Sequence, residues 1–467
     1  MPSRRLVKET INRAGKHFDA CWNILSNLKN QTAERVSILE FQPTLAGALF
    51  ELEEVRDSIN SEMRRLTGRL IVNKQGPSNK WYRHRLKTLD QYQDALRATA
   101  QIGRGIGDAF AWIFYYPHRE YLRKHLQHQA VATIPVGVGG KGELEFLRQI
   151  GGVGNTFAIY HGTTTFLRVG DVSLFDSDSR RFVGLGELKT RRVGPSEIEI
   201  TVHIISSEEF VATSDGDATH IEPIDVTGFS AAARDRHARQ IEEMKRTVKT
   251  QKPPKLLDLR GASHIRDFQI LARALRRTRV AHQRIGDGLL LIAIRERRKR
   301  DLASRLLSRG GGFSDGLSDE VDRKVLEILA PDSQENSVAV GGLDLTLLPG
   351  ATPLFWWDVD QQLLRSIFFQ EIAIVTAYNA IFLVRKLQKA GFRINRVPDS
   401  WKFNVSKDVG GPRAVVHGFE YFVYLITNHL MSEDAVVETV SAYIAEVEDS
   451  KPPPNARMDM DIQLHWL

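Results

Sequence analysis

The stretch Phe166–Thr190 decides the fold expected for this chain: it reads FLRVGDVSLFD, then SDSRR, then FVGLGELKT. Both apolar pieces are rich in β-branched and aromatic residues, which predicts two strands joined by a hairpin turn at Ser177–Arg181. Side chains alternate between faces along a strand, so Asp171, Glu187 and Lys189 continue faces that are otherwise apolar. Burying an unpaired charge costs several kcal/mol, so these groups need partners. A divalent cation held by the two carboxylates, beside the lysine, would satisfy all three.

This arrangement resembles the PD-(D/E)xK nuclease superfamily, which has an Asp on one core strand and Glu-x-Lys on the next. Gly170-Asp171 stands where that family often has Pro-Asp, and Glu187-Leu188-Lys189 supplies the second half. The resemblance extends from about Gly142 to Arg297. It implies an α+β or α/β fold, with a restriction-endonuclease-like mixed β-sheet core flanked by helices.

The resemblance also implies a metal-dependent active site. Mg²⁺, or Mn²⁺ in its place, would be held by Asp171, Glu187 and the backbone carbonyl of Leu188. Lys189 would orient or deprotonate a water molecule. Gln240, in the helix expected at 230–250, matches a Gln or basic residue that points into the site in many members. A surface polar residue is an equally good interpretation of Gln240.

A further carboxylate precedes the strands. The segment Gly142–Ile150 predicts a short helix whose apolar face has Glu143 at its middle, whereas Glu145 falls on the opposite face. Glu143 therefore matches an extra carboxylate that many members of the superfamily carry as a catalytic and metal-binding residue. The alternative is an acidic residue that the helix dipole favours in the first turn.

Composition sets wider bounds. The 467 residues suggest several domains, and the net charge of +7 with a pI near 9.3 favours a polyanionic partner. The single cysteine, Cys21, excludes an internal disulfide framework and favours a reducing compartment. No apolar run follows the basic N-terminus, so we expect no signal peptide and a cytoplasmic location.

The rest of the chain predicts three regions: a helical region at 1–132, the nuclease-like core at 133–310 and a mainly helical region at 311–467. In the first, Thr44–Leu70 has apolar residues at helical spacing, and a later helical stretch is expected to break near Gly103–Gly107. His118, His125 and His128 favour a solvated basic face over a metal site. The glycine-rich Thr133–Gly142 lacks the Gly-x-x-x-x-Gly-Lys-Ser/Thr pattern of a phosphate loop, which argues against an ATPase.

In the core, strands are expected at 156–160, 164–175, 182–189 and 197–205, mostly antiparallel. The apolar run Gly288–Arg295 predicts a strand buried on both faces that closes the same sheet. Basic residues flank this strand and favour contact with a phosphate backbone, although a solvated helix face is the alternative. The predicted nucleic-acid-binding residues are Arg276, Arg277, Arg279, Arg297, Arg298, Lys299 and Arg300.

In the last region, the apolar Ile367–Val384 contains Glu371 and lies between Arg365 and Arg385. We therefore predict a buried core helix rather than a membrane span. Two more helices are expected at Gly418–Met431 and Ser432–Glu448.

These patterns favour a Mg²⁺-dependent endonuclease or exonuclease acting on DNA, with bacterial restriction or phage defence as a plausible setting. Homodimerisation and a protein partner for the helical regions are compatible with that function. Two alternatives stay open: an inactive nucleic-acid-binding scaffold with a nuclease-like core, and a structural or partner-binding component in which the carboxylates form ordinary salt bridges.

Overall fold

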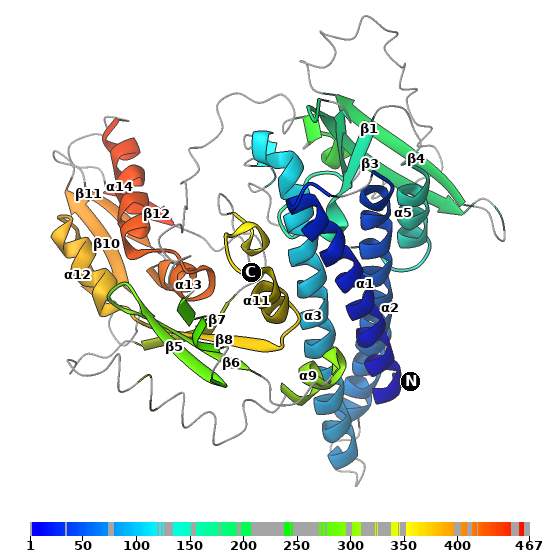
Figure 1. Ribbon diagram of the computed structural model, residues 1–467, viewed down its shortest axis with the longest axis horizontal. Helices are drawn as coiled ribbons and strands as arrows, with labels where there is room; N and C mark the ends of the chain where they lie inside the picture. The colour runs from blue at the N-terminus through cyan, green and yellow to red at the C-terminus, as the bar shows by residue number, and fades with distance from the viewer. Residues whose placement is uncertain are drawn as a thin grey trace, which may run out of the picture.

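A computed structural model gives the fold. It describes residues 2–32, 35–72, 79–118, 121–122, 125, 134–150, 156–176, 179–192, 194, 198–206, 238–242, 244–245, 270–271, 273–275, 278–295, 301–309, 323, 325, 338–343, 345, 352–396, 403–408, 413–417, 419–449 and 457–461. The fold is α+β, with three four-stranded sheets and three long N-terminal helices (Figure 1).

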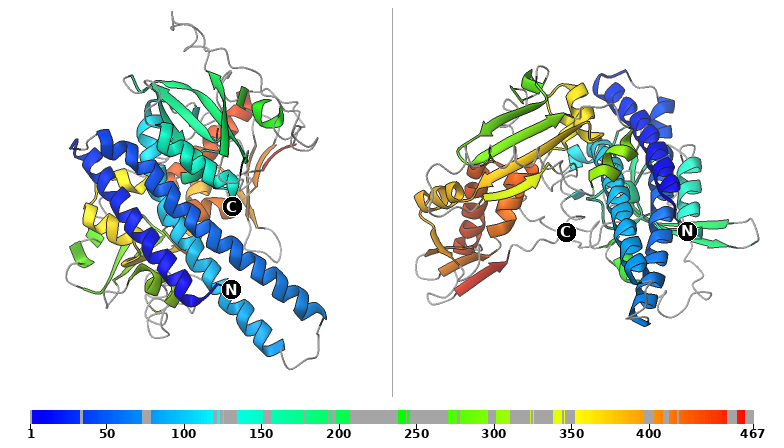
Figure 2. Two further views of the ribbon diagram at one scale, coloured as in Figure 1. Left: turned by 90° about the vertical axis from the view of Figure 1, so that its right-hand side faces the viewer. Right: turned by 90° about the horizontal axis from the view of Figure 1, so that it is seen from below.

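The N-terminal region is helical, as the apolar spacing predicts. Helices α1 (Arg4–Lys29), α2 (Arg35–Val72) and α3 (Asn79–Tyr115) pack lengthwise against one another (Figures 1 and 2). The stripe predicted in α2 faces this packing, because its Leu45, Leu49, Leu52 and Ile59 are buried. A 3-10 turn, η1 (Tyr116–His118), follows α3.

The break expected in α3 near Gly103–Gly107 is wrong, since the helix continues through it. The glycines serve close packing instead. A Cβ at Gly103 would lie 2.6 Å from the Phe18 ring, and one at Gly107 would overlap the carbonyl oxygen of Thr163. The backbone of α3 therefore lies directly against α1 and against the segment that follows the first strand.

The first sheet has the strand order β1-β2-β3-β4, and all its pairings are antiparallel. Its strands are β1 (Thr156–Tyr160), β2 (Val172–Asp176), β3 (Phe182–Arg192) and β4 (Ile198–Ser206). Helix α5 (Val138–Gln149) precedes them, and the 3-10 turn η3 (His161–Thr163) follows β1. The expected order of one helix and four strands is confirmed, although β2 begins only after Asp171.

The apolar run at 288–295 is a strand buried on both faces, β6 (Leu289–Arg295), but it does not close the first sheet. It lies in a second sheet, β5-β6-β8-β7, between β5 (Val280–Ile285) and β8 (Ile372–Asn379), with β7 (Val338–Gly342) on the far side of β8. The prediction of one mixed sheet is therefore wrong, because β6 finds its partner in the C-terminal part of the chain.

The C-terminal region contains more sheet than expected. Besides β7 and β8, it forms a third sheet in the order β12-β11-β10-β9. The strands are β9 (Arg393–Arg396), β10 (Phe403–Asp408), β11 (Arg413–His417) and β12 (Arg457–Asp461). The two predicted C-terminal helices are confirmed as α13 (Phe419–His429) and α14 (Glu433–Asp449).

The single helix expected at Ile367–Val384 is wrong. The chain instead forms α11 (Gln361–Phe368), reverses at Gln370 with φ 60°, and continues as β8 and then α12 (Ile381–Lys389). Within the described part of the chain, no helix combines the length and the apolar character that a membrane crossing requires.

Two further segments join the halves of the molecule. Helix α9 (Leu302–Arg309) packs on α1 and α3, and the turn η5 (Leu354–Trp356) packs against the same helices. Trp356 donates a hydrogen bond from Nε1 to the Ala109 carbonyl of α3 at 2.8 Å. Arg365 of α11 pairs with Asp19 of α1 at 2.7 Å.

Candidate functional site

Helix α5 positions the first carboxylate. A Cβ at Gly142 would overlap the side chain of Thr190, so the glycine lets α5 lie directly on β3. This packing turns Glu143 toward the sheet, where it is 8% exposed. Glu145 lies on the other side and pairs with Arg148 at 3.3 Å. The predicted orientation of the two acids is confirmed.

A glycine turn presents Asp171. Gly170 has φ +72°, and a Cβ there would lie 2.9 Å from the Gly186 carbonyl oxygen. The Asp171 N–H donates to that same carbonyl at 2.8 Å. The Asp171 carboxylate then accepts a hydrogen bond at Oδ2 from the Leu188 N–H at 2.7 Å. The side chain of Asp171 thus accepts the hydrogen bond of the Leu188 N–H in β3, in place of a backbone carbonyl of β2, which starts one residue later.

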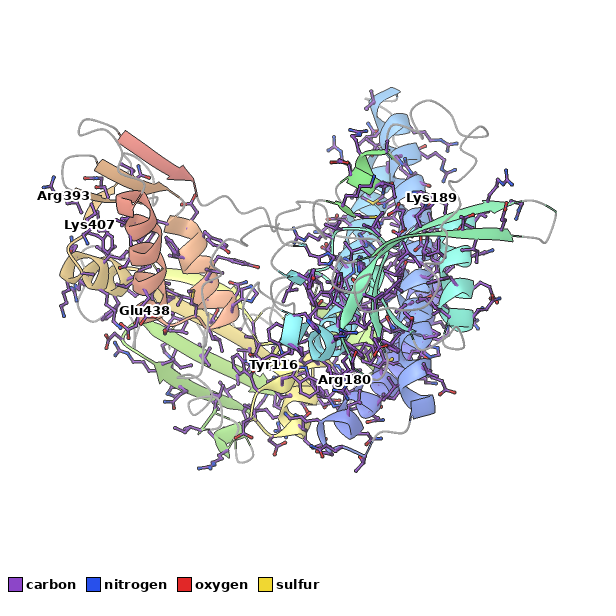
Figure 3. The ribbon with its side chains drawn as sticks, turned by 90° about the horizontal axis from the view of Figure 1, so that it is seen from above. Tyr116, Arg180, Lys189, Arg393, Lys407 and Glu438 are labelled. Atoms are coloured by element: carbon purple, nitrogen blue, oxygen red, sulfur yellow. The ribbon has the colours of Figure 1, made fainter. Side chains whose placement is uncertain are left out.

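Glu187 and Lys189 share one face of β3, as predicted. Lys189 Nζ lies 2.6 Å from Glu187 Oε1 and donates to Gln240 Oε1 at 3.2 Å (Lys189 is labelled in Figure 3). Gln240 comes from residues 238–242, which are helical. The structure therefore brings Gln240 to the lysine, where the resemblance places it.

The carboxylates at this site repel one another. Burial, and then the charge of Asp171, raise the pKa of Glu143 to about 8. Burial and the charge of Glu187 raise the pKa of Asp171 to about 7, against the hydrogen bond from Leu188. Tyr160, at the end of β1, donates a hydrogen bond to Glu143 Oε2. A cation among these groups would relieve the repulsion.

The oxygen atoms are suited to a hard divalent cation, which prefers carboxylate ligands. Glu187 Oε2 is buried and has no hydrogen-bond partner among the described residues. Among the same residues, no group of three or more His, Cys, Asp or Glu side chains is placed so that it could hold a metal ion. Asp171, just before β2, and Glu187 of β3 are the pair that would hold such a cation, with Glu143 close enough to feel both charges. Leu188 contacts Asp171 through its N–H, so a ligand role for its carbonyl stays a prediction.

Sequence patterns did not identify a chain of buried hydrogen bonds behind the Asp171 turn. His125 Nδ1 accepts from the Arg168 and Val169 N–H groups, each at 3.2 Å, so its hydrogen is on Nε2, 3.1 Å from the Tyr115 hydroxyl. Tyr115 in turn contacts Ser173 Oγ, which lies 2.6 Å from His161 Nε2.

His161 completes the chain at the Asp171 turn. Burial lowers the pKa of His161 to about 3, so the ring is neutral. Its Nδ1–H donates to the Gly170 carbonyl at 2.8 Å, and its backbone N–H donates to the Asp171 carbonyl at 2.9 Å. The expectation that His125 lies on a solvated face is wrong, since it is fully buried; His128 lies outside the described residues.

Arg279, one of the predicted nucleic-acid-binding residues, does not share the first sheet. Arg279 is exposed beside β5, and its Nε donates to the Arg295 carbonyl of β6 at 3.4 Å. It therefore belongs to the second sheet, in the other half of the molecule (Figure 1). The other predicted nucleic-acid-binding residues lie outside the described part of the chain: Arg276, Arg277, Arg297, Arg298, Lys299 and Arg300.

Comparisons of this chain with protein-family models, with curated proteins and with solved structures found no match.

Proposed function

We propose that this protein is a metal-dependent nuclease of the PD-(D/E)xK type that hydrolyses phosphodiester bonds in DNA. One observation carries the proposal. Asp171 and the Glu187–Lys189 pair come together where the start of β2 lies beside the middle of β3. Glu187 Oε2 is buried there without a partner among the described residues. An oxygen atom in that state needs a cation or a donor.

In this proposal Asp171, Glu187 and Glu143 hold Mg²⁺ or Mn²⁺. The bound ion supplies Lewis acidity toward the phosphodiester and lowers the pKa of a coordinated water. The Leu188 N–H fixes the Asp171 carboxylate, so its second oxygen has a defined direction. Tyr160 does the same for Glu143.

Lys189 orients the attacking water in this proposal. An ammonium group has three donors, and Glu187 Oε1 and Gln240 Oε1 take two of them. The third remains for the water or for a phosphate oxygen, whose developing negative charge the ammonium group stabilises. Gln240 is a positioning residue for Lys189.

DNA is the substrate that the composition supports best, since the net charge is +7. A cytoplasmic location agrees with the single cysteine, Cys21, which is a buried free thiol. The first sheet is an antiparallel meander without β6, so the restriction-endonuclease-like core rests on the residues of the site and on its helix-then-strands order.

The test is cleavage of supercoiled and linear DNA by the purified full chain with Mg²⁺, with Mn²⁺ and with EDTA. We expect cutting that needs the metal and falls at least a hundredfold in Glu187→Gln and in Lys189→Met. Titration of Mn²⁺ in the absence of DNA gives a second readout, in which Glu187→Gln and Asp171→Asn weaken binding.

Helix α5 offers a matched control. Glu143→Gln and Glu145→Gln make the same substitution two residues apart, one at the site and one on the outer side. Only Glu143→Gln is expected to reduce cutting and Mn²⁺ affinity. DNA binding without cutting under every condition would instead support the inactive-scaffold alternative. Cutting that survives Glu187→Gln and Lys189→Met would disprove the assignment of this site.

A further inference from the structure

The distal end of the α2–α3 hairpin is strongly basic. Helices α2 and α3 extend past the start of α1, where Arg85 donates to the Pro2 carbonyl at 2.8 Å (Figures 1 and 2). This end, the hairpin tip, is defined by six exposed basic side chains: Arg64, Arg65, Arg69, Lys80, Arg83 and Lys87. They come from two segments that only the antiparallel packing of the helices brings together.

Nearby acids do not neutralise these charges. Glu62 is buried and pairs with Arg85 at 3.0 Å, and the exposed Asp57 and Asp90 lie at the base of the tip. Among the residues that the structure describes, none of the six basic side chains has a carboxylate within ion-pair distance. The hairpin tip is therefore an uncompensated positive surface.

Most of these charges do not serve the stability of the helices, although Arg69 lies in the last turn of α2, where a helix dipole favours a cation. Arg65 and Arg69 are four residues apart on α2, and Arg83 lies three residues from Lys80 and four from Lys87 on α3. Like charges at these spacings destabilise a helix by roughly 0.2–0.5 kcal/mol a pair. The first turn of α3 contains Lys80 and no acidic residue, the reverse of what a helix dipole favours. A polyanionic ligand would remove these repulsions.

Two large apolar side chains are exposed among the arginines: Ile71 at 63% and Trp81 at 53%. Trp81 contacts Tyr82 edge-on, with ring centroids 5.3 Å apart. An aromatic ring beside several basic groups suits contact with a nucleic-acid backbone, in which Lys and Arg pair with phosphates while the ring packs against the adjoining sugars.

The hairpin also connects this tip to the candidate active site. Gly107 of α3 packs against Thr163, in the segment between β1 and Asp171. From Gly107 to Arg83 the helix rises roughly 36 Å, at about 1.5 Å a residue. That length corresponds to roughly one turn of B-form DNA, about 34–36 Å.

We infer that the hairpin tip binds the phosphate backbone of a nucleic acid, at a distance from the cutting site, and that Trp81 contacts the same strand. The inference rests on the proposed nuclease function for the identity of the polyanion. It is independent of the basic segment around β6, which belongs to another part of the fold.

The experiment measures binding of the full chain to a fluorescein-labelled DNA of about 30 base pairs, in EDTA, over a range of salt concentrations. The variant Arg65→Gln/Arg69→Gln/Arg83→Gln is expected to bind at least tenfold more weakly at about 0.1 M salt. Its slope of log affinity against log salt should be shallower by about 2–3, since each lost phosphate contact removes roughly 0.9.

The matched control is Lys16→Gln/Arg385→Gln/Lys389→Gln, which removes three exposed positive charges outside the tip. It should retain most of the slope and affinity. DNA should also protect Trp81 from acrylamide quenching, measured as the difference between the wild type and Trp81→Phe. Equal losses in both triple variants, or a wild-type slope in the tip variant, would overturn the inference.

Vesicles containing phosphatidylserine distinguish another anionic surface. A tip variant that loses vesicle binding but keeps the wild-type salt slope on DNA would also overturn it. Because binding is measured in EDTA, the result does not depend on cleavage. If the tip variant has a changed salt slope but the wild type never cuts DNA, the inference about the tip stands and the proposed nuclease function fails. If the wild type cuts DNA but the tip variant has an unchanged slope, the nuclease function stands and the inference about the tip fails.

Discussion

Lys189 Nζ lies 2.6 Å from Glu187 Oε1, and the pair joins a carboxylate side chain that is 2% exposed to a lysine side chain that is 27% exposed. In the described part of the chain, the Lys189 ammonium group pairs with Oε1 of the Glu187 carboxylate and compensates its charge. Glu187 Oε2 has no hydrogen-bond partner in the same part of the chain.

Removal of the lysine should destabilise the fold. In Lys189→Met the buried Glu187 carboxylate loses its compensating charge, at a cost of about 2 kcal/mol in the free energy of unfolding. Glu187→Gln in the same background should recover most of that loss. Urea unfolding of the two single variants and the double variant measures the coupling. Arg191 and Glu199 form an exposed pair on the same sheet, and their removal should cost about 0.5 kcal/mol or less. Equal costs for Lys189→Met alone and for Lys189→Met combined with Glu187→Gln would contradict burial of Glu187.

The pH dependence of stability should reveal Glu143. Burial raises its pKa from 4.5 in the unfolded chain to about 8 in the fold, so the folded state binds the proton more tightly. The contribution of Glu143 to stability is therefore fully present below about pH 4.5 and is lost as pH rises toward about 8. When pH is raised from about 5 to 7, the free energy of unfolding of Glu143→Gln should fall by roughly 2–3 kcal/mol less than that of the wild type. Chemical unfolding at a series of pH values measures the difference, and Glu145→Gln, which should follow the wild-type curve, is the control.

Gly170 should not tolerate a side chain. With φ +72° and the Gly186 carbonyl 2.9 Å from the position of a Cβ, Gly170→Ala should cost about 1–2 kcal/mol and displace Asp171. Thermal unfolding and Mn²⁺ titration report the two effects. Gly47, inside α2 with open space around it, is the matched control, and Gly47→Ala should stabilise by about 0.5–1 kcal/mol. Equal changes in the free energy of unfolding for Gly170→Ala and Gly47→Ala would contradict this role of Gly170.

The hydrogen-bond chain through Ser173 has one direction, from His125 through Tyr115 and Ser173 to His161. Nitrogen NMR of histidine-labelled protein should find the Nε2–H tautomer for His125 and the Nδ1–H tautomer for His161. Ser173→Ala removes the acceptor of the Tyr115 hydroxyl hydrogen and the donor to His161 Nε2, both buried, and should cost about 1–3 kcal/mol. Ser441→Ala, which removes an exposed hydroxyl, should cost less than about 0.5 kcal/mol. An Nε2–H tautomer at His161 would show that the chain does not end on the Gly170 carbonyl.

Local patterns predicted the elements in which one periodicity dominates. The helical spacing in α2 and the β-branched residues of β3, β4 and β6 each allowed one structure. The orientation of Glu143, and the common face of Glu187 and Lys189, follow from the periods of helix and strand. The position of Gln240 followed from the resemblance and from no pattern in the residues themselves.

The wrong predictions depended on partners distant in the chain. Residues 367–384 are apolar throughout, and such a run has no periodicity that separates helix from strand. The pairing of β6 with β8 joins residues that are 77 to 89 positions apart, from Arg295 opposite Ile372 to Leu289 opposite Tyr378. The glycines of α3 resembled a break because the close approach of Phe18 and Thr163 is visible only in the fold. The hairpin tip was missed for the same reason, since its two basic segments meet only when α2 and α3 pair.

The place of β6 between β5 and β8 has a practical consequence for dividing this chain into fragments. A protein ending at residue 310 would keep β5 and β6 but lose β8, leaving the apolar β6 as an uncovered edge strand with unpaired backbone groups. Such edges pair with other copies, so this fragment should be prone to aggregation. It would also lose the contacts of η5 and α11 with α1 and α3. Biochemical work on the candidate site therefore calls for all 467 residues, even though the last described residue of the site is Gln240.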